Sequence, residues 1–176
     1  MSSNTKTGRF FCRHKQMTEQ KFDYVIMFKK KGDEALKIVV VDGQGGGIGR
    51  LIVEKLRQEI GASANIIGLG TNAVASSAML KAGSNEGASG ENAVIYNVRK
   101  VDCIVGSIAI IAANSFAGEL SPRMAEAIAS ADAVKILIPL NRAGIKIPGV
   151  TGESLPLQVD QLVEKVREFG EQMELA

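Results

Sequence analysis

At residues 41–50 the chain reads VDGQGGGIGR, between an apolar segment (37–41) and a segment with helical periodicity (48–60). Glycines this dense at a strand-to-helix turn let the backbone pass close to a ligand and leave N–H groups exposed at the positive end of the helix dipole. A phosphate is the natural guest of such a turn. Residues Gly43–Gly49, hereafter the glycine loop, therefore predict nucleotide binding, although they name no reaction.

Beyond the glycine loop, apolar strand-like segments alternate with amphipathic ones, which is typical of a parallel sheet with crossover helices. Strands are expected at 37–42, 65–69, 102–105 and 134–138, and helices at 48–60, 73–82, 91–100, from 122 onward and at 155–169. The segment 83–90 is expected to be a loop and 144–148 a short edge strand, whereas 108–113 fits either a strand or a helix. The predicted fold class is α/β, a three-layer Rossmann-like fold with a mostly parallel sheet and helices on both faces.

Charge separates the chain into a basic tail and a mildly acidic body. Residues 1–36 carry eight Lys or Arg against four Asp or Glu, whereas residues 37–176 carry 13 against 15. We expect a basic, flexible extension at 1–35, one nucleotide-binding domain at 36–170 and a short tail at 171–176. Whether 1–35 belong to the native protein stays open, since Met17 and Met27 are alternative starts.

Composition speaks against several other classes of protein. The basic tail has interspersed acids, which argues against nucleic-acid binding. Cys12 and Cys103 form no CxxC pair, and the apolar run at 103–113 is far shorter than the ~20 residues of a membrane span. The N-terminus lacks a secretory apolar region. We therefore expect a cytoplasmic protein with no membrane and no metal partner.

The residues predicted to bind a nucleotide lie after the first two strands, where ligands collect in open α/β sheets. They are Asp42, Gly43, Gln44, Gly45, Gly46, Gly47, Ile48, Gly49, Thr71 and Asn72. Helix capping is an equally good interpretation of Asn72 or Thr71, since either can be the N-cap of the following helix. Ser121 before Pro122 is likewise the expected N-cap of a later helix.

The spacing of the glycine loop departs from the strict GxGxxG fingerprint, because Ile48 occupies the position of the third glycine. It resembles instead the TGxxxGIG loop of short-chain dehydrogenases, with Asp42 in place of threonine. A carboxylate there either caps the loop amides or faces a ribose, a metal or a substrate. The acid that a dinucleotide fingerprint places after the second strand is also missing, so NAD and NADP cannot be told apart.

Two further motifs match incompletely. Tyr96-x-x-x-Lys100 has the spacing of the short-chain dehydrogenase catalytic pair, but it lies too close to the glycine loop along the chain. The run 46–51 superimposes on part of the deviant Walker motif, but Arg50 replaces its lysine and Leu51 its hydroxyl, which speaks against P-loop hydrolysis.

Other polar residues near strand ends are secondary candidates. Ser107 and Asn141 follow predicted strands, and Asn114 and Glu119 lie in a turn before a helix. His14 is the only histidine, so the body of the chain has no histidine for a catalytic triad or a metal site.

Several ordered blocks carry a family resemblance. DGQGGGIG, GLGTNAVAS, GASGENAVIYN, ANSFAGELSPRMAEAI and ILIPLNR, between residues 42 and 142, are similar to an uncharacterised family of small bacterial proteins. The resemblance extends over about 37–166 and implies a Rossmann-like domain of unknown function. It implies no catalytic residues.

Together these features predict a protein that binds NAD or NADP, with ATP and FAD open as alternatives. A small oxidoreductase is the first hypothesis for its activity, and a non-catalytic nucleotide-sensing or ATP-binding regulatory module is the second. A third is a structural interaction protein whose glycine loop stays empty. A nucleotide is the expected partner, and a homodimer stays open.

Overall fold

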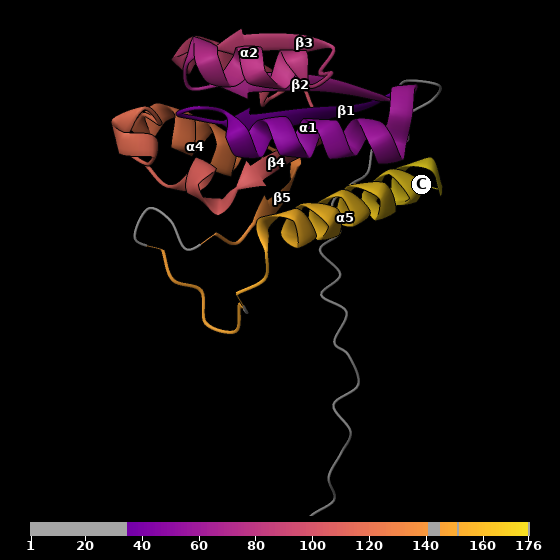
Figure 1. Cartoon of the computed structure of the whole chain (residues 1–176). Helices are drawn as coiled ribbons and strands as arrows, with labels where there is room; N and C mark the ends of the chain where they lie inside the picture. The colour runs from indigo at the N-terminus through magenta and orange to yellow at the C-terminus, as the bar shows by residue number, and fades with distance from the viewer. Residues whose placement is uncertain (1–34, 141–144, 151, 176) are drawn as a thin grey trace, which may run out of the picture.

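The computed structural model describes residues 35–140, 145–150 and 152–175. Within them, one parallel sheet has the strand order β3-β2-β1-β4-β5 (Figure 1). Its strands are β1 (Leu36–Asp42), β2 (Ala64–Gly70), β3 (Glu86–Ser89), β4 (Cys103–Ser107) and β5 (Val134–Ile138). The helices are α1 (Gly47–Ile60), α2 (Ala73–Lys81), α3 (Glu91–Asn97), α4 (Pro122–Ser130) and α5 (Leu155–Leu175), with short 3₁₀ turns at Gly61–Ser63, Ile108–Ile111 and Phe116–Gly118.

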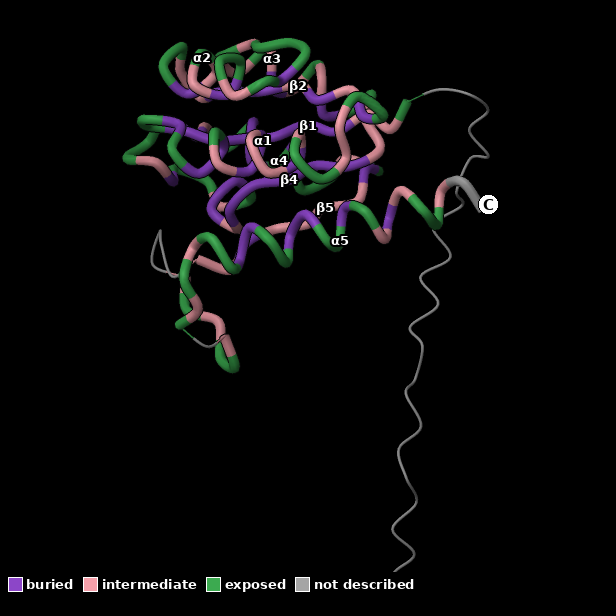
Figure 2. The backbone as a smooth tube through the Cα atoms, turned by 45° about the vertical axis from the view of Figure 1, so that its right-hand side comes forward, coloured by how far each residue is buried: buried purple, intermediate pink, exposed green. Residues whose placement is uncertain are grey.

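Helices cover both faces of the sheet. One apolar cluster joins β1 to α1, α2 and α5, through side chains such as Ile52, Met79 and Val163. A second cluster joins the opposite face to α4 and to the segment around α3, through Val94 and Met124 among others. The central strands β1 and β4 are consequently buried almost throughout (Figure 2). The predicted three-layer α/β fold is confirmed.

Alternation along β1 shows why both faces are needed. Ile38 and Val40 belong to the first cluster and Val39 and Val41 to the second, and all four are at most 1% exposed. Because successive side chains of a strand point to opposite faces, a continuous apolar run predicts a strand covered on both sides.

Two predicted elements were wrong, and one predicted helix is longer than expected. Residues 86–89 form the edge strand β3 rather than part of a loop; its sequence, EGAS, is too polar to show a strand pattern. In the described part of the segment 144–148 no strand forms, and Gly144 lies outside the described residues. Helix α5 continues past Phe169 to Leu175. The ambiguous segment at 108–113 begins with a 3₁₀ turn, Ile108–Ile111.

Two other expectations concern residues that the structure does not describe. The extension expected at 1–35 lies outside the described residues except for Ala35, and so does Asn141. None of the helices in the described part of the chain combines the length and the apolar character that a membrane span requires.

Candidate functional site

The glycine loop lies at the carboxyl edge of the sheet, where the chain changes sides. From β1 the chain continues into α1 on one face, whereas the connection after its neighbour β4 leads to α4 on the other. The turn after β2 is tied to the same place by a hydrogen bond of 3.0 Å from Thr71 N to the Asp42 carbonyl oxygen. This topological switch point is where open α/β sheets collect their ligands.

Asp42 is turned into the glycine loop and is only 4% exposed. Its Oδ1 accepts from Gly43 N at 2.8 Å and its Oδ2 from Gly49 N at 2.6 Å. The second bond satisfies one of the N–H groups that the first turn of α1 leaves without an intrahelical partner. Of the two roles open to this carboxylate from the sequence, the structure shows the capping of loop amides.

At three positions of the loop, neighbouring atoms leave no room for a side chain. A Cβ on Gly43 would lie 2.7 Å from the Phe116 ring, and one on Gly49 would lie 2.7 Å from Met79 Sδ and 2.8 Å from Asp42 Cβ. Gly46 has a φ of 67°, and its Cβ would lie 2.6 Å from Ala75 Cα. Gly49 thus takes the helix-to-strand packing role of a third fingerprint glycine, one position later than GxGxxG would place it.

Gly45 and Gly47 differ from these three, because a Cβ on either would meet no heavy atom within 4 Å. Their N–H groups, and that of Ile48, have no hydrogen-bond partner in the part of the chain that the structure describes. Gly47 and Ile48 are the first two residues of α1, so these donors lie at the positive end of a 14-residue helix. Some amides of the loop therefore have acceptors within the protein, whereas those of Gly45, Gly47 and Ile48 have none among the described residues.

Glu119 also reaches the loop, from the connection between β4 and α4. Its Oε2 accepts from Thr71 Oγ1 at 2.5 Å, from Asn72 Nδ2 at 2.7 Å and from Gln44 N at 2.9 Å. These hydrogen bonds hold the pKa of the Glu119 carboxyl below its usual value of 4.5, and the one from Thr71 has the largest effect. The carboxylate is therefore charged at neutral pH.

Asn72 is fixed as well. Its Oδ1 accepts from Ala75 N at 2.9 Å, which makes it the N-cap of α2, and its Nδ2 donates to the Gln44 carbonyl oxygen at 3.0 Å. The helix-cap alternative for Asn72 is confirmed, and the same side chain also ties α2 to the glycine loop.

The segment that carries Glu119 holds an unusual backbone. Asn114, Phe116 and Ala117 have φ values of 63°, 56° and 59°, in the left-handed region that costs a non-glycine residue ~1–2 kcal/mol. Internal hydrogen bonds hold the segment, including Asn114 N to the Leu120 carbonyl oxygen at 2.8 Å. Strained backbone of this kind persists where the surrounding structure determines it, and it clusters at functional sites.

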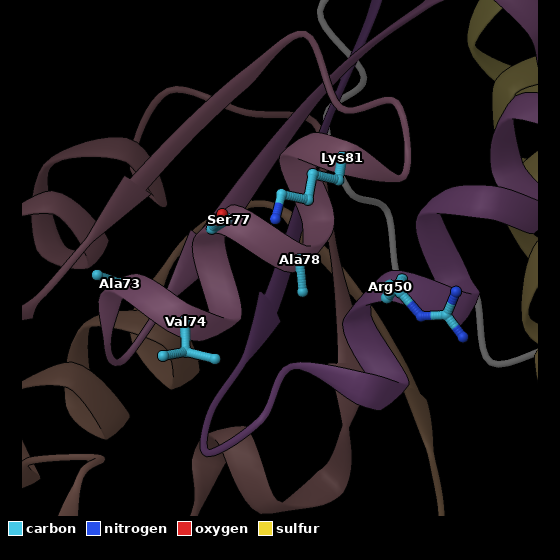
Figure 3. Close-up of a pocket in the computed structure, with 6 residues that line it drawn as sticks. All are labelled: Arg50, Ala73, Val74, Ser77, Ala78 and Lys81. Atoms are coloured by element: carbon cyan, nitrogen blue, oxygen red, sulfur yellow. The ribbon is translucent and has the colours of Figure 1, made fainter.

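A shallow pocket of about 640 Å³ adjoins the loop on the side of α2 (Figure 3). Arg50 of α1 lines it, together with residues of α2, which are Ala73, Val74, Ser77, Ala78 and Lys81. In Figure 3 the Arg50 guanidinium points away from α2, and it pairs with Glu54 at 2.7 Å. Arg50 is thus not placed as a P-loop lysine would be.

The remaining candidates do not join the loop. Lys100 lies three residues before β4 begins, and its Nζ stacks 3.4 Å from the centroid of the Tyr96 ring, toward the amino edge of the sheet. Lys100 lowers the pKa of Tyr96, but this pair faces solvent away from the glycine loop.

Ser121 caps α4. Burial raises the pKa of Cys103 to about 12, so its thiol stays protonated at neutral pH. Among the described residues, no group of His, Cys, Asp and Glu is arranged to hold a metal ion.

Sequence reasoning placed Glu119 only among turn residues, and it missed Phe116 altogether. Both contact the loop across more than 70 residues of sequence, and neither lies in a strand or an α-helix. The one available signal was the presence of a charged residue in a polar turn before a capped helix.

A scan of family models finds one described as a domain of unknown function (DUF3842), which matches residues 37–171. No curated protein and no solved structure matches the chain. The match extends over the five strands apart from Leu36, the first residue of β1, and includes the glycine loop and most of α5. The chain belongs to the family of the domain of unknown function DUF3842.

Proposed function

We propose that the protein binds a nucleotide through the glycine loop, with an NAD-type dinucleotide as the leading candidate. One observation carries the proposal: the N–H groups of Gly45, Gly47 and Ile48 lack partners among the described residues, and the two glycines are exposed with open space beside them at or just before the start of α1. Unsatisfied amides at a helix N-terminus favour a phosphate, because each donates to an oxygen while the helix dipole attracts the charge.

The neighbouring amides make this observation specific. Gly43 N and Gly49 N donate to Asp42, and Gln44 N donates to Glu119. The amides that flank the open ones therefore already have acceptors within the protein. The three open amides are left for an acceptor from outside.

A dinucleotide fits the packing of the loop. The close contact of Gly49 with Asp42 and Met79 draws the start of α1 onto the end of β1. The open position of Gly45 gives a pyrophosphate close access to the backbone, as the second glycine of a dinucleotide fingerprint does. The proposal concerns binding, and the chemistry of a nicotinamide would be supplied by the cofactor itself.

Thermal unfolding with added ligand tests the proposal. The unfolding midpoint would be measured with NAD, NADP, ATP and FAD, and with inorganic phosphate for comparison. A nucleotide at about 100 times its Kd stabilises the folded state by ~2.7 kcal/mol. We therefore expect the unfolding midpoint to rise with at least one of these nucleotides. The absence of a rise with any nucleotide at millimolar concentration would refute the proposal.

A further inference from the structure

Glu119 lies where a dinucleotide-binding protein needs an acid, although it comes from another part of the chain. The usual acid follows the second strand and accepts the adenosine ribose hydroxyls. Here Thr71 and Asn72 follow β2, and both donate to Glu119 Oε2. A carboxylate from the β4–α4 connection is thereby held beside the end of β2.

The two oxygens of Glu119 are used differently. Oε2 receives three donors, whereas Oε1 has no hydrogen bond with any residue that the structure describes. All three donors are neutral, and no described Lys or Arg forms an ion pair with Glu119. One oxygen is thus held in place, and the other keeps its lone pairs for a donor from a ligand.

The position of Glu119 also fits the geometry of a nucleotide. Gln44 N, which donates to Glu119, directly precedes Gly45, the first of the three open amides. A ribose at Oε1 and a 5′-phosphate at those amides would therefore be neighbours, as they are in every adenosine nucleotide.

We infer that Glu119 accepts the ribose hydroxyls of the bound nucleotide, so that the protein selects a free 2′,3′-diol over a 2′-phosphate. Two hydroxyls can donate to the carboxylate, whereas a 2′-phosphate would bring like charges together and leave no donor at that position. This inference rests on the proposed function and narrows it to NAD, or another nucleotide with an unmodified ribose, in preference to NADP.

Titration calorimetry with NAD and NADP tests this selection on the wild type and on Glu119→Gln. The glutamine oxygen can still accept from Thr71 and Asn72, so the loops stay tied while the charge is lost. Glu126→Gln is the matched control, because Glu126 is exposed on α4, away from the loop. Thermal unfolding of each variant reports whether it is folded.

We expect the wild type and the control to bind NAD at least about tenfold more tightly than NADP. Glu119→Gln should bring the two Kd values within about threefold of each other, mainly through weaker binding of NAD. The inference is overturned if the wild type binds both nucleotides equally, or if Glu119→Gln keeps the full preference. Binding of neither NAD nor NADP by the folded wild type would instead overturn the dinucleotide as the leading candidate of the proposed function, and the inference with it.

Discussion

Replacing Gly47 by aspartate separates the stability of α1 from the phosphate binding that we propose for it. Gly47 is exposed, has no positive φ, and would place a Cβ within 4 Å of no other heavy atom. The first turn of α1 contains no acidic residue. An aspartate there is therefore accepted sterically and complements the helix dipole.

The expected effect on folding is favourable. A carboxylate in the first turn contributes about 0.3–1 kcal/mol, and loss of glycine from the unfolded chain contributes about 0.4–1 kcal/mol. The free energy of unfolding of Gly47→Asp should thus rise by roughly 0.7–2 kcal/mol, measured by denaturant titration.

Binding should change in the opposite direction. A carboxylate about 5 Å from a phosphate costs about 1–3 kcal/mol at an effective dielectric constant of about 80 to 20, which is roughly a five- to 150-fold loss of affinity. Calorimetry with NAD measures this, and added salt should reduce the difference. Gly152→Asp is the control, because Gly152 is equally open and lies outside the loop. A folded Gly47→Asp protein with wild-type affinity would refute the reasoning.

Four other changes have defined outcomes. Gly46→Ala should lower the free energy of unfolding by about 2–5 kcal/mol, from a left-handed φ and the contact with Ala75, and a loss under ~1 kcal/mol in denaturant titration would contradict this. Asp42→Asn removes one charge-assisted acceptor from two loop amides and should cost about 1.5–3 kcal/mol by the same assay; unchanged stability would count against the capping role. The stability that wild type gains over Glu119→Gln should be present above pH 4.5 and lost as pH falls below it, since the folded-state pKa is depressed; a gain that grows in acid would be inconsistent. Tyr96→Phe should leave the Kd for NAD unchanged within about twofold in calorimetry, and a tenfold loss would place the site elsewhere.

Most of the fold could be predicted because its signals are local. The apolar run of β1, the stripe of Ile52 and Leu56 on α1 and the cap at Ser121 are each readable within one element. The strand β3 could not be predicted, because its four residues are mostly exposed and its pairing with β2 supplies what its sequence lacks. Local propensity is overridden there by tertiary context.

The candidate site divides in the same way. The glycine loop and the cap at Asn72 follow from neighbouring residues. The position of Glu119 depends instead on the strand order, which places β2 and β4 on either side of β1, and on a left-handed backbone at Phe116 and Ala117. Glu119 thereby reaches across the end of β1 to the turn after β2. Sequence spacing contains neither fact.

Amide chemical shifts test the central claim most directly. In a titration of ¹⁵N-labelled protein with NAD, we expect the largest changes at the N–H groups of Gly45, Gly47 and Ile48, because a phosphate would take up these open donors. Gly152 should remain unchanged. Saturable binding whose changes leave these three amides untouched and gather instead around Ser77 and Lys81, in the neighbouring pocket, would contradict the account.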